Sequence, residues 1–299
     1  MMLRGILYEV TDVETFFRSF LADSSPINLG SISPIKGGWV GIQHAEGWTS
    51  GSSSSLGCPT DDAGQFELDV SQTPDGPMFL TASGSQNWLV DAWYRSPLSR
   101  PLSHDGNVLE IYVARVTMPD ESGFSQADLD KVLEAMRQHV QDVERITGRI
   151  TEDGIALSGS GSGATASCSI LLKPDRSGNP ETCICHTVQN FRLDLPGPAW
   201  LTGLLVNRSE IERKIRSGAK KLAGQIDEQL QKRAIAAFMG QAAGKGNAQA
   251  DRIIRSATLT VERLRYPVTA GQQSPSGGHR SITGDVCLGF VQNRKRERT

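Results

Sequence analysis

The longest amphipathic pattern in the chain lies between residues 209 and 239. Apolar residues recur there at spacings of three and four, and charged residues, mostly basic in the first half, fill the positions between them. Ser209 and Glu212 have the spacing of a capping box, and Gly240 is a stop signal. The pattern predicts a long helix with one face built to be buried. Its apolar positions are Ile211, Ile215, Ala219, Leu222, Ala223, Ile226, Leu230, Ile235 and Phe238.

A second helical pattern covers residues 122–147. Ser125 and Asp128 have the spacing of an N-terminal cap, and Gly148 follows as a stop signal. This segment is therefore expected to be a second long amphipathic helix. Its apolar stripe consists of Leu129, Val132, Leu133, Met136, Val140, Val143 and Ile146.

Most of the remaining chain has the pattern of short strands, in which β-branched and aromatic residues are separated by Gly, Ser, Pro and Asp clusters. The expected fold is α+β, with an N-terminal antiparallel β-sandwich followed by an antiparallel sheet packed with two long amphipathic helices. The expected domains are 1–121, 122–292 and a basic tail, 293–299. The strands are expected at 5–10, 39–43, 65–70, 77–82, 108–116, 149–150, 154–157, 166–172, 183–195, 258–266 and 282–291.

Two apolar clusters in the N-terminal region each allow two interpretations. Residues 16–21 have near-helical spacing and form either a helix that covers the sandwich or a contact surface. Trp88, Trp93 and Tyr94 belong either to the sandwich core or to an interface with a protein partner.

The segment from Lys173 to His186, with the apolar residues that follow it and the start of the long helix, resembles the middle of the tubular lipid-binding superfamily, which includes the bactericidal permeability-increasing protein. The resemblance implies that a lipid or another hydrophobic small molecule binds in a groove between the helix and a curved sheet. If the groove is closed, the same positions face a core. The implied contact residues are Phe191, Leu193, Trp200, Leu204, Ile215, Leu222, Ile226 and Leu230.

The acidic turn before residue 65 carries a second resemblance. Thr60, Asp61, Gly64 and Phe66 have the spacing found in transthyretin-like and carboxypeptidase-regulatory-like domains, which are small β-sandwiches. Gly64 suits a positive φ, and the Asp side chains can bond their own turn backbone. Calcium binding by Asp61 and Asp62 is the alternative interpretation.

Composition and charge limit the classes of partner that are expected for this chain. Thirty-one basic and 33 acidic residues give a net charge of −2, which argues against general nucleic-acid binding. The first residues lack an apolar segment long enough for a signal peptide, so the expected location is cytoplasmic, or outside the cell without a cleavable signal. The basic tail allows at most peripheral membrane contact. Five cysteines without a repeated spacing fit reduced thiols.

Catalytic chemistry has little support in the sequence. The five histidines are scattered, and no nucleophile elbow or zinc-binding helix motif is present. Cys183 and Cys185 are expected on one face of a strand and His186 on the other, so no metal site is predicted. The glycine run 158–163 lacks a phosphate-binding lysine and is interpreted as a turn or a flexible sheet edge. No enzyme activity and no cofactor are predicted.

Two functions follow from these patterns. The first is non-enzymatic binding of a lipid or another apolar ligand between the long helix and its sheet, with the N-terminal sandwich as a docking module. The second is a structural component of a larger assembly, such as a toxin complex or surface apparatus, without a ligand and with a protein partner bound through the N-terminal domain.

Overall fold

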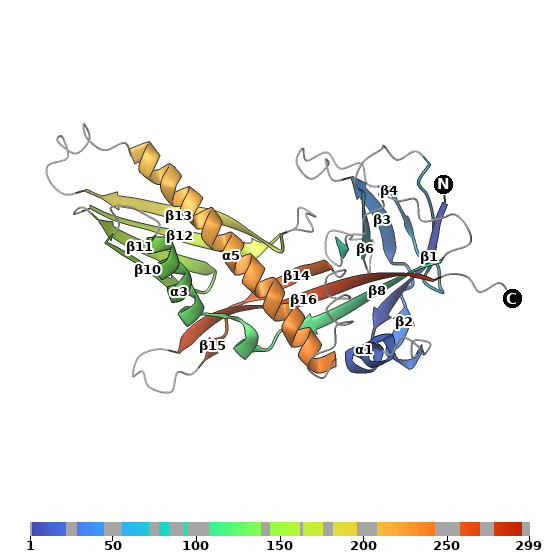
Figure 1. Ribbon diagram of the computed structural model, residues 1–299. Coiled ribbons are helices and arrows are strands. Elements are labelled where there is room, and N and C mark those ends of the chain that lie inside the picture. Colours follow the sequence, from blue (N-terminus) through green and yellow to red (C-terminus); the bar gives the residue numbers. More distant parts are fainter. Residues whose placement is uncertain are drawn as a thin grey trace.

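The computed structural model of the chain describes twelve stretches of the sequence, and within them the protein is a mixed α+β structure (Figure 1). Its helices are α1 (Val13–Leu21), α3 (Gln126–Arg137) and α5 (Arg208–Ala242), and its short 3-10 turns are η1 (Leu29–Ser31) and η2 (Asp120–Ser122). The described residues are 2–21, 29–44, 56–71, 78–83, 93–94, 108–138, 144–161, 164–175, 182–195, 208–242, 258–269 and 278–294.

The largest sheet runs along most of the molecule and joins the two ends of the chain. Its strand order is β14-β16-β8-β1-β2, with β5 also on β1 and with β9 and β15 on β16. The pair β1–β8 is parallel, which differs from the antiparallel sandwich expected from the sequence. The strands are β1 (Met2–Val10), β2 (Ile32–Pro34), β5 (Gln65–Asp69), β8 (Val108–Thr117), β9 (Phe124–Ser125), β14 (Thr258–Arg265), β15 (Val268–Thr269) and β16 (His279–Arg294).

Strand β8 is buried on both faces, and this explains its nearly continuous apolar sequence. Leu109, Ile111 and Val113 pack toward the smaller sheet β4-β3-β6-β7, in one core with residues of β1, β3, β5 and β6. Tyr112 and Ala114 point the other way, toward α1, where the Phe16 ring lies 5.0 Å from the Tyr112 ring. The strands of the smaller sheet are β3 (Trp39–His44), β4 (Leu56–Pro59), β6 (Met78–Ser83) and β7 (Trp93–Tyr94).

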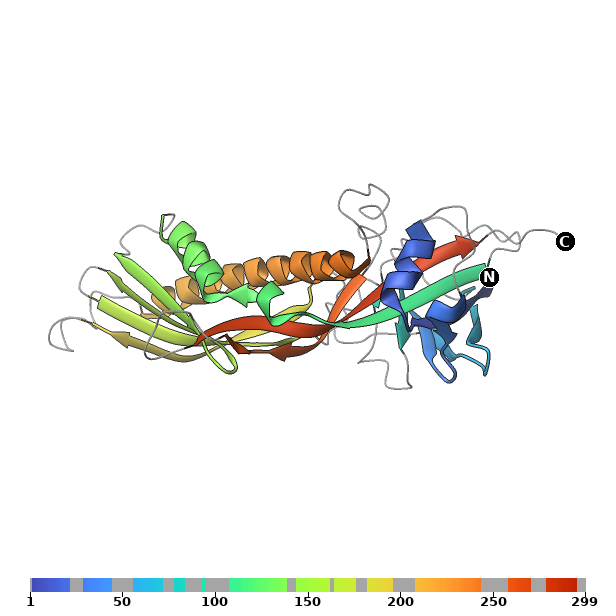
Figure 2. The ribbon, with the colours of Figure 1, turned by 90° about the horizontal axis from the view of Figure 1, so that it is seen from below.

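The third sheet is an antiparallel meander with the order β10-β11-β12-β13. Helices α3 and α5 lie on the same face of it, and no described helix or strand covers the other face (Figure 2). Its strands are β10 (Arg145–Ile150), β11 (Gly154–Gly161), β12 (Ala164–Pro174) and β13 (Ile184–Asp194).

One continuous apolar core lies under α5 and extends from the β10–β13 sheet to α1. It contains Leu129, Val132 and Leu133 of α3, together with the apolar stripe of α5 from Ala219 to Ala234. Because α5 spans this whole core, the helix fastens the meander sheet to the largest sheet (Figure 1).

Helix α3 is shorter than the sequence predicted. Its capping box of Ser125 and Asp128 is present, but the helix ends at Arg137. Ile146 belongs to β10, and Val140 and Val143 lie outside the described residues. Ile146, Gly148 and Ile150 share the strand face that α3 covers. Ile146 also has the spacing of the apolar stripe of α3, so the sequence pattern did not show where the helix ends and the strand begins.

Helix α5 begins at Arg208, so Ser209 lies inside the first turn and the predicted serine cap is wrong. Glu212 accepts instead from the Arg216 guanidinium, at 2.7 Å. The predicted boundary between regions, at residues 121 and 122, falls in η2. Strand β16, from the second predicted region, pairs with the full length of β8, from the first.

Candidate apolar ligand site

The β10–β13 sheet presents alternate residues to α3 and α5. A Cβ atom on Gly148 would come within 2.6 Å of Leu133 and 3.1 Å of Leu129, so even-numbered residues of β10 face the helices. The pairing then places Ile150, Ile155, Ile170 and Val188 in one row on that face. The first three are almost completely buried, so the helices seal the sheet at this row.

Two rows further along the strands, the same face has small side chains. Ile146 pairs with Gly159, Gly159 with Ala166, and Ala166 with Leu193. Among the described residues, a Cβ atom on Gly159 would meet only the carbonyl oxygen of Arg145, at 3.5 Å. All four residues of this row are only half-buried. The helix-facing side of the sheet is therefore less closely covered here than at the Ile155 row.

A β-bulge in β13 brings Phe191 and Leu193 to the helix-facing side. Ser169 pairs with Gln189 and Ser167 with Arg192, so Asn190 and Phe191 together oppose Cys168. Asn190 has a φ of 54°, the left-handed conformation that asparagine tolerates better than most residues. The extra residue reverses the alternation, which places Phe191 and Leu193 toward α5 and Arg192 on the opposite side of the sheet.

Helix α5 runs from this poorly covered end of the sheet toward the sealed end. Asp227 bonds to the beginning of β13, whereas Lys220, two turns earlier, lies near His186. The first turns of α5 therefore extend toward the end of β13 that contains Leu193. In these turns Ile211 and Ile215 are half-buried, whereas every apolar stripe position from Ala219 to Ile226 is at most 3% exposed.

We call the half-buried apolar residues at this end the apolar tip surface. The sheet and the first turns of α5 both contribute to it, and all its members are on surfaces that face the space between helix and sheet. The apolar tip surface consists of Ile146, Phe191, Leu193, Ile211 and Ile215.

The ligand contacts predicted from the sequence fall into three groups. Phe191, Leu193 and Ile215 belong to the apolar tip surface. Leu222, Ile226 and Leu230 are at most 2% exposed and pack in the core, so in this structure they face protein side chains. Trp200 and Leu204 lie outside the described residues. Ile146 and Ile211 were not among the predicted contacts, and only the pairing of β10 and the position of α5 place them here.

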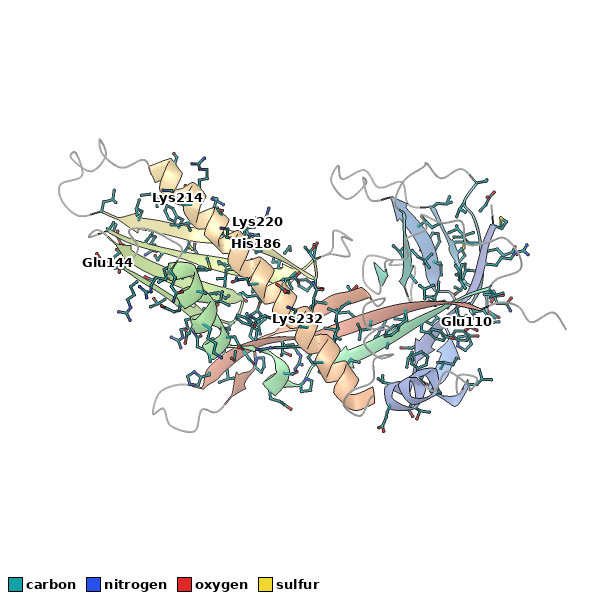
Figure 3. The ribbon with its side chains drawn as sticks, viewed as in Figure 1. Glu110, Glu144, His186, Lys214, Lys220 and Lys232 are labelled. Carbon is teal, nitrogen blue, oxygen red and sulfur yellow. The ribbon has the colours of Figure 1, made fainter. Side chains whose placement is uncertain are left out.

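His186 marks the transition between the sealed and the half-buried parts of α5. It is half-buried on the helix-facing side of β13, and Figure 3 shows it beside Lys220 near the middle of the helix. Burial, and then the charge of Lys220, lower the pKa of His186. The neutral imidazole is therefore favoured at this position.

Two polar contacts hold the helices over the sheet. Asp227 of α5 is 6% exposed, and its Oδ1 accepts from the backbone N–H groups of Cys183 and Ile184 at 2.9 and 3.0 Å. Arg233 of α5 donates to Asp128 of α3 at 2.8 Å. Partial burial by itself would raise the pKa of Asp128, but hydrogen bonds from Arg233 and Ser125 hold this pKa well below its usual value. Both contacts lie toward the sealed end.

The cysteine and histidine segment matches the prediction in part, because Cys185 and His186 occupy opposite faces of β13. Cys183 precedes β13 and is buried, and its thiol donates to the Leu259 carbonyl at 3.2 Å. Cys185, inside the strand, is exposed, so the two cysteines do not share one environment. No three His, Cys, Asp or Glu side chains converge as metal ligands in the described ranges.

Two turn predictions have different outcomes. Asp61 accepts from the N–H groups of Ala63 and Gln65 at 2.9 and 2.8 Å, and Gly64 has a φ of 74°, as the turn interpretation predicted. The glycine run 158–163 was expected to be a turn or sheet edge. Residues 158–161 instead form the end of β11 between two neighbouring strands, and residues 162 and 163 lie outside the described residues. Small alternating side chains suit this strand because Gly159 lies opposite Ala166 on the helix-facing side.

The aromatic segment 88–94, on which the assembly hypothesis depends, lies mostly outside the described residues. Trp88 lies outside the described residues, and of Trp93 and Tyr94 only the β7 backbone is described. Along the parts of the chain that the structure describes, no helix combines the length and apolar character needed to cross a bilayer.

The site and the fold define a mixed α+β protein in which a long helix covers one face of an antiparallel meander. Comparisons of the chain with protein-family models, with curated proteins and with solved structures find no match.

Proposed function

We propose that this chain binds the acyl chain of a lipid, or a ligand of similar shape and polarity, at the apolar tip surface. The observation that carries the proposal is the gradient of burial along α5. The apolar stripe of α5 is buried where it lies over the Ile155 row, whereas Ile211 and Ile215, which lie beyond this row, are half-buried. Apolar surface that is left partly in water gains free energy when a ligand covers it, at about 25 cal/mol per Å².

The shape of the sheet supports a narrow apolar ligand. Gly159 and Ala166 occupy the middle of the last helix-facing row, and the larger Ile146 and Leu193 stand at its two ends. Small residues between large ones leave room for a chain to lie along the strands.

The charge near the site supports an anionic head group on that ligand. Arg213, Lys220 and Lys221 project from the first half of α5, and each is exposed. A carboxylate or phosphate at the end of an acyl chain would meet these cations at the outer surface of the helix.

The proposal agrees with the resemblance to the tubular lipid-binding superfamily, which also implies a ligand between helix and sheet. In the same proposal the N-terminal region, which contains the transthyretin-like Asp61 turn, docks the protein to its site of action. The proposed role needs no catalytic residue and no cofactor.

The test is uptake of oleate and of phosphatidylglycerol by the purified protein, measured by native mass spectrometry and by displacement of a fluorescent fatty acid. We expect Leu193→Asp and Ile215→Asp to reduce uptake at least tenfold, because each places a charge on the surface that the acyl chain would cover. The matched control is Leu29→Asp, because Leu29 is 77% exposed on η1 and outside this surface.

Each variant must keep the thermal midpoint of the parent chain within a few degrees for its uptake to be interpreted. No uptake by the parent chain, or equal loss in Leu29→Asp, would rule the proposal out. In that case the assembly role without a ligand becomes the preferred hypothesis.

A further inference from the structure

The face of the β10–β13 sheet that points away from α3 and α5 contains a shallow depression that is open to solvent, with a volume of about 690 Å³ and a lining of polar and apolar atoms in similar proportion. The residues at its centre have short side chains, and the two longest side chains stand on the outer strands. The lining includes Arg149, Ser158, Ser167, Ser169, Asn190 and Arg192.

The strand pairing explains why the depression is there. One row across the four strands is Thr147, Ser158, Ser167 and Arg192, and the next contains Arg149, Ala156 and Ser169. Short side chains on the two central strands make the floor, and an arginine from each outer strand makes a wall. Arg192 reaches this face only because of the bulge at Asn190.

Both arginines are available to a ligand. Within the described ranges no carboxylate pairs with Arg149 or Arg192. They stand on the two outer strands, three inter-strand steps of about 4.8 Å apart, or roughly 14 Å. A planar guanidinium binds a carboxylate or sulfate with two parallel hydrogen bonds. The depression therefore suits a ligand with at least two separated anionic groups.

The floor between the arginines is suited to hydroxyl groups. A serine hydroxyl donates one hydrogen bond and accepts others, and the Asn190 amide does both as well. A sugar hydroxyl has the same two capacities. From these residues we infer that the depression is a binding site for an anionic oligosaccharide, whose acidic groups bind Arg149 and Arg192 and whose hydroxyls bind the serines between them.

Other partners fit the depression less well. Protein hot spots are enriched in Trp and Tyr, and single-stranded nucleic acids stack on aromatic side chains, but the lining contains no aromatic residue. The net charge of −2 also disfavours a nucleic acid. The site is on the opposite side of the sheet from the apolar tip surface, and the inference does not rest on lipid binding.

The experiment is calorimetric titration at about 0.15 M salt, where the Debye length of about 8 Å screens long-range attraction. The probes are hexagalacturonate, a sulfated chondroitin hexasaccharide, neutral maltohexaose and hexaglutamate. We expect one or both acidic sugars to bind, and the acidic group that binds identifies the source. We expect maltohexaose not to bind.

Three variants test the residues, and one controls for charge. Arg149→Gln and Arg192→Gln should each weaken binding at least tenfold, and Ser167→Tyr should weaken it similarly by filling the floor while keeping both cations. Lys131→Gln removes one positive charge from exposed α3 on the other side of the sheet and should leave binding unchanged.

Several results would overturn the inference. These are no binding of either acidic sugar, equal binding of maltohexaose, unchanged affinity in the three depression variants, or equal loss in Lys131→Gln. Binding of hexaglutamate with the same dependence on Arg149 and Arg192 would show that the occupant is an acidic polypeptide.

Discussion

The carboxylate of Asp227, in the middle of α5, accepts two backbone hydrogen bonds at the start of β13, from Cys183 and from Ile184. Its second oxygen accepts from Gln231 at 3.0 Å. Cys183 and Ile184 are both buried, and the helix side chain supplies an acceptor for their N–H groups. This contact fixes the position of α5 along the sheet and therefore determines which of its apolar residues lie over which row.

Replacing Asp227 tests this role. Asp227→Ala leaves two buried N–H groups without an acceptor and should cost about 2–4 kcal/mol of unfolding free energy. Asp227→Asn keeps an acceptor and removes a buried charge, so it should change that free energy by less than about 1 kcal/mol at pH 7. Urea denaturation followed by circular dichroism measures both. Equal destabilisation by the two substitutions would contradict the assignment.

Asp227 also predicts a dependence on pH. Burial, its largest influence, raises the pKa of this carboxyl above its ordinary value. The folded protein then binds a proton more tightly than the unfolded chain, so the contribution of Asp227 to stability decreases as the pH rises from about 3.9 through the raised pKa. The stability of Asp227→Asn relative to the parent chain should increase over the same interval.

The contact between Asp128 and Arg233 should have the opposite dependence on pH. The pKa of Asp128 is lowered, so its contribution is complete above the unfolded value of about 3.9 and is lost as the pH falls through the lower folded value. Asp128→Asn should cost about 1–2 kcal/mol at pH 7, through the cap and the ion pair. That cost should shrink in denaturation experiments at pH 3 and below, and a cost that is constant with pH would argue against the ion pair.

Two glycines on the same face of neighbouring strands test whether the helices cover the sheet less closely at the Gly159 row than at Gly148. Gly148→Val places its side chain against Leu133 and Leu129 and should destabilise the fold by about 1–3 kcal/mol. The Cβ atom of Gly159→Val meets only the Arg145 carbonyl oxygen among the described residues, and the variant should be neutral or stabilising, because valine favours strands. The same Gly159 variant should reduce fatty-acid uptake, since it fills the middle of the proposed site. Thermal unfolding and the uptake assay give the two readouts.

The bulge at Asn190 should tolerate glycine but not a β-branched residue. Asn190→Gly keeps the left-handed conformation and should change stability by less than about 0.5 kcal/mol, whereas Asn190→Val should cost about 1–3 kcal/mol. Deleting Asn190 removes the extra residue and leaves Phe191 alone opposite Cys168, so Phe191 and Leu193 keep the helix-facing side and Arg192 keeps the opposite side. The folded deletion variant should therefore retain both proposed binding activities. Loss of both activities would show that the bulge itself, and not the alternation on either side of it, positions these residues.

Features that depend on a few neighbouring residues were predictable from the sequence. The capping box of Ser125 and Asp128, the Asp61 turn with its positive φ at Gly64, and the long helix are confirmed in the structure. Each depends on hydrogen bonds or on periodicity within one segment, and such interactions leave a local pattern.

The sequence was least informative where alternation changes or where two periods coincide. Ile146 fits both the apolar stripe of a helix and the alternating pattern of a strand. It belongs to a strand because β10 pairs with β11. Val188 and Phe191 have opposite parity in β13, which is a trace of the bulge, but only the pairing with β12 shows where the extra residue lies. The predicted serine cap of α5 had correct spacing and the wrong position.

The sequence by itself determined which residues of α5 are apolar, and thus that one face of this helix must be covered. Only the tertiary structure decided what covers each turn. Asp227 positions the helix so that Leu222 and Ile226 meet bulky strand residues, while Ile211 and Ile215 extend toward the row of Gly159 and Ala166. The distinction depends on contacts between segments far apart in the chain, and the energies of such contacts have no counterpart in local periodicity.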